Sequence, residues 1–169
     1  MERPNAWLEQ LHAEGSSSNW QPHTERWATA EFIQWAQDND PDAVSKIQLL
    51  ISELETHGGH VNGGRATTPS FNVRFNVLGV GKKWPLCMYS LPQRGSTLEI
   101  RFGDFRNTPD VADAFVQAVC SIPEFGLDAA EIRNAGYRKR PQFAIKNLSE
   151  AAVRSLAKNV ASALQVDNS

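Results

Sequence analysis

SFNVRFNVL (70–78), WPLCMYSL (84–91) and TLEIRFGDF (97–105) are three strand-like runs, separated by GVGKK (79–83) and PQRGS (92–96). In the first run, phenylalanine and valine alternate with asparagine and arginine, and aliphatic residues alternate with charged residues in the third. A period of two places one set of side chains on each face of a sheet. We therefore expect an antiparallel three-stranded meander with its apolar face on a core and an arginine- and asparagine-bearing face turned outward.

Around this meander, apolar residues recur at helical spacing. A short turn at Asp40–Asp42 separates two segments of this kind and predicts an N-terminal helical hairpin. Thr29 is the expected cap of its first helix, and further helices are expected at 108–121 and, after Ser149, at 150–165. QFAIKNL (142–148) is the expected fourth strand.

This order of elements predicts an α+β fold with helices packed on one face of the sheet. The predicted core contains residues from the strands and from the last two long helices: Phe71, Val73, Phe75, Leu86, Met88, Leu98, Ile100, Phe102, Phe115, Val119, Leu156 and Val160.

The chain has 169 residues, of which 41% are hydrophobic and 21% are charged, as is common in a single soluble domain. We expect an N-terminal arm and linker at 1–24 and one α+β domain at 25–169. No apolar run approaches the roughly 20 residues of a membrane span, and the first residues lack the features of a signal peptide. These features predict a cytoplasmic protein without a membrane partner.

Several segments, taken in order, resemble a poorly characterised bacterial domain that occurs alone or at the C-terminal end of larger proteins. They are EFIQWAQDN (31–39), HGGHVNGGRATTPSF (57–71), PLCMYSL (85–91) with LEIRF (98–102), and KRPQFAIKNL (139–148). The resemblance covers about residues 30–165 and implies a bacterial source. No activity is established for this family, so the resemblance assigns no catalytic residue.

No motif in the chain predicts catalysis, a metal or a cofactor. His57 and His60 are two histidines around a glycine pair, whereas zinc requires three or four ligands, so the end of a helix is the better interpretation. The glycine-rich segment Gly63–Ser70 lacks the ending of a nucleotide P-loop. It leaves one alternative open, a small enzyme whose anionic ligand is held by this loop and Arg65.

Basic residues give the strongest functional indication. Arg74 and Arg101 belong to the polar set of the meander, and Tyr137, Arg138, Lys139 and Arg140 directly precede Pro141. Together they predict a local positive surface with an aromatic ring for stacking, although such residues also keep a surface soluble. A net charge of −2 argues against indiscriminate nucleic-acid binding. We therefore expect a non-enzymatic interaction module that binds a protein or a nucleic acid.

Tryptophans are concentrated near the N-terminus, at Trp7, Trp20 and Trp27. Tryptophan anchors many interfaces. We expect these residues either to dock on the chain's own core or to form a homodimer, with a slight preference for the homodimer.

Overall fold

The computed structural model describes residues 26–166, and these form an α+β domain with one antiparallel sheet. The described helices are α2 (Thr29–Asn39), α3 (Val44–Thr56), α4 (Pro109–Cys120), α5 (Ala129–Asn134) and α6 (Glu150–Leu164). The strands are β1 (His60–Gly63), β2 (Ser70–Val77), β3 (Gly81–Leu91), β4 (Gly95–Ile100) and β5 (Gln142–Ala144). The predicted α+β class is confirmed.

The strands follow one another across the sheet in the order in which they occur in the chain, β1-β2-β3-β4-β5. One polar row, interrupted by the buried Cys87 of β3, crosses all five strands at directly paired positions: Asn62, Asn72, Cys87, Glu99 and Gln142. The sheet has one more strand than expected, because β1 lies in a segment interpreted as a loop. This strand has only four residues and none of them is buried, so its sequence lacks the apolar alternation that reveals the others.

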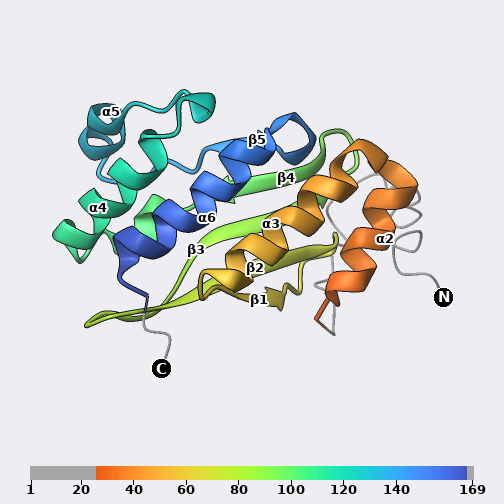
Figure 1. Cartoon of the computed structure of the whole chain (residues 1–169), viewed down its shortest axis with the longest axis horizontal. Coiled ribbons are helices and arrows are strands. Elements are labelled where there is room, and N and C mark those ends of the chain that lie inside the picture. Colours follow the sequence, from red (N-terminus) through yellow and green to blue (C-terminus); the bar gives the residue numbers. More distant parts are fainter. Residues whose placement is uncertain (1–25, 167–169) are drawn as a thin grey trace, which may run out of the picture.

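The opposite, apolar face of the sheet holds the core. α3 and α6 lie across this face, with α2 beside α3 and α4 beside α6 (Figure 1). Phe32 of α2 meets Phe71 of β2 edge to face at 4.6 Å, and Phe102 and Phe105 both contact Phe115 of α4. All twelve predicted core residues are buried. The alternation therefore assigns the two faces of the sheet correctly.

The ends of several elements differ from the expectation. The residue at the cap position of α2 is Ala28, because Thr29, the expected cap, is already the first residue of the helix. The Glu31 carboxylate accepts a hydrogen bond from the Ala28 N–H at 2.8 Å. The Ser149 hydroxyl accepts from the Ala152 N–H, as a cap of α6 should. β5 is shorter than expected, because Ile145–Asn147 turn into a 3-10 helix.

A bulge interrupts the pairing of β2 with β3. Val73 pairs with Leu86 and Phe75 with Lys83, so two residues, Trp84 and Pro85, stand opposite Arg74 alone. Proline has no N–H for the ladder and is found at bulges and edges of sheets. The N–H of Trp84 donates instead to Asp104 Oδ2 at 2.9 Å, in the 3-10 turn η3 (Phe102–Phe105) that follows β4.

The end of β1 is held against the segment before α2 at very close range. The Trp27 N–H donates to the Gly64 carbonyl at 3.0 Å, and the Trp27 ring N–H donates to the Ala66 carbonyl at 2.8 Å. A Cβ on Gly63 would lie 1.7 Å from the Trp27 carbonyl oxygen. Only glycine therefore fits at this position without moving backbone.

Gly63→Ala is predicted to lower the free energy of unfolding by about 1–3 kcal/mol, the usual cost of overpacking. Chemical denaturation of the whole chain measures this change. Asn62→Ala, at the neighbouring exposed position, is the control and should stay within about 0.5 kcal/mol of the wild type. Equal stability of the Gly63→Ala chain and the wild type would contradict the close approach of Gly63 to the Trp27 backbone.

Candidate functional site

A hydrogen-bonded cluster around Glu99 occupies the centre of the polar face. The Glu99 carboxylate belongs to a residue that is 6% exposed, and it accepts from Arg101 Nε at 2.8 Å, Tyr89 Oη at 3.0 Å and Gln142 Nε2 at 3.1 Å. Arg101 also donates to the Asn72 side chain at 3.3 Å. Side chains from β2, β3, β4 and β5 are thereby tied together on the face that α3 and α6 do not cover (Figure 1).

The charge of this cluster is stable near neutral pH. Burial raises the pKa of Glu99, but hydrogen bonds from Arg101, Gln142 and Tyr89 outweigh burial, so the pKa lies below its usual value. Burial, together with the charge of Glu99, raises the pKa of Tyr89. Burial likewise raises the pKa of the Cys87 thiol to about 11, which keeps it protonated and a poor nucleophile.

A cleft of about 360 Å³ opens beside this cluster. It lies between the segment that leaves β4 and the segment that enters β5, and it is lined by Arg101, Gly103, Asp104, Arg106, Arg138 and Arg140. The Ile100 N–H donates to the Pro141 carbonyl at 3.0 Å, which fixes the two segments side by side. A Cβ on Gly103 would lie 3.3 Å from the Tyr137 carbonyl oxygen, so the segments also approach closely at that point.

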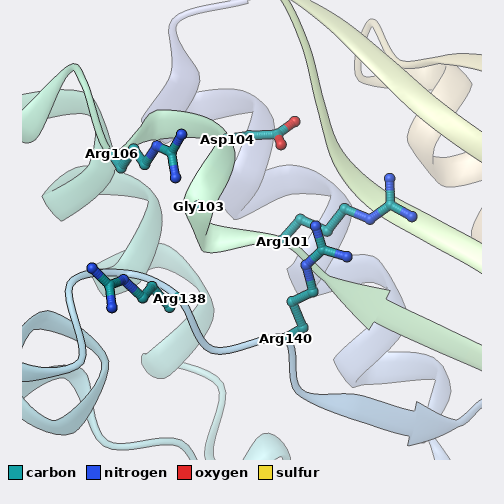
Figure 2. Close-up of a pocket in the computed structure, with 6 residues that line it drawn as sticks. All are labelled: Arg101, Gly103, Asp104, Arg106, Arg138 and Arg140. Atoms are coloured by element: carbon teal, nitrogen blue, oxygen red, sulfur yellow. The ribbon is translucent and has the colours of Figure 1, made fainter.

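The arginines of the cleft form two groups. Arg101 and Arg140 share Glu99 Oε1, at 2.8 Å and 3.9 Å, and their side chains lie close together in Figure 2. Arg106 and Arg138 stand on the other side of Gly103 (Figure 2). Neither of these two forms an ion pair with another residue in the described range 26–166. The cleft therefore carries a surplus of positive charge.

The structure brings together three of the basic residues expected from the sequence, Arg101, Arg138 and Arg140. Arg74 lies on the polar face but does not line the cleft. Two other expected residues have intramolecular partners: Tyr137 Oη donates to Asp113 at 2.8 Å, and Lys139 pairs with Glu131 at 2.8 Å. Neither of these two side chains lines the cleft.

Arg65 is exposed on the loop between β1 and β2, outside the cleft. The carbonyls of this Gly63–Ser70 loop accept from Arg26 and Trp27, so the loop holds the chain segment that precedes α2. His57 and His60 do not line the cleft either. The enzyme alternative, which needs the loop and a histidine at one pocket, gains no support from this arrangement.

Arg106 and Trp84 were not among the expected site residues. Arg106 follows η3, a turn without any helical or strand periodicity, so its proximity to Arg101 in the sequence is the only signal that could have found it. Trp84 is 42% exposed, and its position before a proline is the signal for the bulge that displays it.

One of the three tryptophans expected at a dimer interface, Trp27, lies within the described residues. Trp27 is 2% exposed and packs in the chain's own core. Trp7 and Trp20 lie outside the described residues, so the homodimer stays a prediction.

No group of three or more potential metal ligands occurs within residues 26–166. In the same range, no helix combines the length and apolar character that crossing a bilayer requires.

The chain matches no protein-family model, no curated protein and no solved structure in the comparisons made. The resemblance to a bacterial domain, the bacterial source and the cytoplasmic location therefore stay predictions from the sequence.

Glu99→Gln is predicted to lower the free energy of unfolding by about 1–3 kcal/mol at pH 7, because Arg101 then lacks its carboxylate partner. The folded-state pKa of Glu99 is lowered, so its charge stabilises the fold above the unfolded pKa of about 4.3. This stabilisation is lost as the pH falls through the folded-state pKa. Denaturation of both chains between pH 7 and pH 3 should therefore show the difference shrinking at low pH.

Glu55→Gln, at an exposed position of α3, is the matched control and should leave stability almost unchanged across this pH range. A Glu99→Gln defect that is absent at pH 7, or that is as large at pH 3 as at pH 7, would contradict the role given to this carboxylate.

Proposed function

We propose that this chain is a non-enzymatic interaction module that binds single-stranded nucleic acid through the polar face of the sheet and the arginine cleft. The observation that carries the proposal is that four arginines line one cleft, which has a single lining carboxylate, Asp104. Arginine suits phosphate because its planar fork donates two parallel hydrogen bonds. The chain as a whole is slightly acidic, so this cleft is a local feature and not part of a generally basic surface.

An exposed tryptophan is joined to the cleft through its backbone. Trp84 is 42% exposed, and its backbone N–H is bound to Asp104, which lines the cleft. Arg74 stands opposite Trp84 across the bulge. An aromatic ring beside arginines offers a stacking surface for a base next to donors for its phosphates.

The composition of the polar face favours a nucleic acid over a protein partner. Protein interfaces gain most of their affinity from apolar and aromatic anchors at a desolvated centre. This face instead carries the hydrogen-bonded cluster around Glu99, and the exposed large apolar side chains of the described residues are Leu78 and Trp84. Single strands present unpaired bases to stack, whereas duplex DNA does not.

The test is equilibrium binding of single-stranded RNA and DNA of about 12 nucleotides, and of the corresponding duplexes, by fluorescence anisotropy over a range of salt concentrations. The logarithm of the affinity for single strands should fall linearly with the logarithm of salt concentration, because phosphate binding releases counterions. Arg74→Ala/Arg140→Ala should weaken binding and reduce the salt slope by about 0.7 for each phosphate that the variant no longer neutralises. Trp84→Ala should weaken binding by about 1–3 kcal/mol without changing the slope.

Lys146→Ala/Lys158→Ala removes the same charge at exposed positions outside the cleft and the polar row, and should bind like the wild type. Absence of binding to every strand at low salt would overturn the proposal and leave protein partners. Equal weakening by the control variant would show that binding follows net charge alone.

A further inference from the structure

Arg106 and Arg138 set the cleft apart from the remainder of the polar face. Arg101 and Arg140 already neighbour Glu99, whereas Arg106 and Arg138 have no carboxylate partner in the described part of the chain. Arg106 and Arg138 alone contribute a formal charge of +2 that no ion pair within the described residues offsets. A phosphodiester carries a single negative charge and would neutralise only half of it.

A phosphomonoester matches this charge. It carries a charge of about −1.5 to −2 at neutral pH and has three strong acceptor oxygens. A diester within a strand has a lower charge and one acceptor oxygen fewer. The cleft offers guanidinium groups on both sides of Gly103, those of Arg106 and Arg138 on one side and those of Arg101 and Arg140 on the other (Figure 2). Each guanidinium group can donate two parallel hydrogen bonds to phosphate oxygens.

The size and rigidity of the cleft suit a phosphate attached to a sugar. Its volume of about 360 Å³ lies at the lower end of the range of small-molecule sites. Asp104 is held by the Trp84 N–H, and the chain segments on either side are joined by the Ile100–Pro141 hydrogen bond. An acceptor such as Asp104 would repel a second phosphate but can bind a sugar hydroxyl. The walls therefore favour one phosphate with a hydroxylated neighbour.

We propose that the cleft binds a terminal phosphomonoester, so that the module recognises the phosphorylated end of a single strand. This proposal rests on the proposed function, because the strand then continues from the cleft along the polar face towards Trp84. The internal phosphates contact Arg74 and Arg140, and the terminal phosphate contacts Arg106 and Arg138.

The experiment compares one oligonucleotide in three forms, with a 5′-phosphate, with a 3′-phosphate and with hydroxyl groups at both ends, in the anisotropy assay. One phosphorylated form should bind on the order of tenfold more tightly than the hydroxyl form. Arg106→Ala/Arg138→Ala should remove this advantage while it retains most of the affinity for the hydroxyl form. Lys146→Ala/Lys158→Ala, which leaves the cleft intact, should retain the advantage.

Competition by a nucleoside monophosphate and by inorganic phosphate separates the possible sources of the phosphate. A strand-end site predicts that both compete weakly and only against the phosphorylated form. Equal affinities for all three forms would overturn the terminal phosphate site while the proposed function stands. Binding of no strand would overturn the proposed function. If the mononucleotide still bound in that case, the ligand of the cleft would be a free phosphomonoester and not the end of a strand.

Discussion

Burial of one face of the sheet beneath α3 and α6 is the constraint on which the rest of the structure depends. Successive side chains of a strand point to opposite faces. Every apolar residue that packs under the helices therefore places the next residue of its strand on the opposite, polar face. Phe71, Val73 and Phe75 are each almost fully buried, and Asn72, Arg74 and Asn76 alternate with them on the polar face. A shift of one residue would bury the arginine and expose the phenylalanines, so the register is strongly determined.

The polar face that results is held in place by its own hydrogen bonds. Glu99 binds Tyr89, Arg101 and Gln142, which orders long side chains that would otherwise lose conformational entropy on binding a partner. The same carboxylate offsets part of the charge of Arg101 and Arg140, so the unpaired charge is concentrated at Arg106 and Arg138. The cluster around Glu99 thus determines where on this face an anionic group binds most favourably.

The sequence was sufficient for the parts of the fold that depend on periodicity. Alternation in β2 and β4 and helical spacing in α3, α4 and α6 correctly predicted the α+β class and the core. β1 was missed because none of its four residues is buried, and the role of Gly63 depends on Trp27, far away in the chain. Neither of these features leaves a pattern in the local sequence.

The candidate site was predictable only in part for the same reason. Arg101, Arg138 and Arg140 were identifiable as basic residues near strand ends, but their convergence depends on η3 and on the Ile100–Pro141 hydrogen bond. The sequence also could not show that Tyr137 and Lys139 are engaged by Asp113 and Glu131, since these partners come from α4 and α5. Side-chain pairing across elements decides which basic residues stay available.

A titration of the ¹⁵N-labelled chain with an unpaired oligonucleotide, followed by amide chemical shifts, would locate the binding surface residue by residue. A partner bound on the polar face would shift the amides of Arg74, Trp84 and Arg101 and those of the 138–140 segment, and leave the outer surfaces of α3 and α6 unchanged. Shifts concentrated on α3 and α6, or on the Gly63–Ser70 loop, would contradict the assignment of the polar face and its arginine cleft as the binding surface.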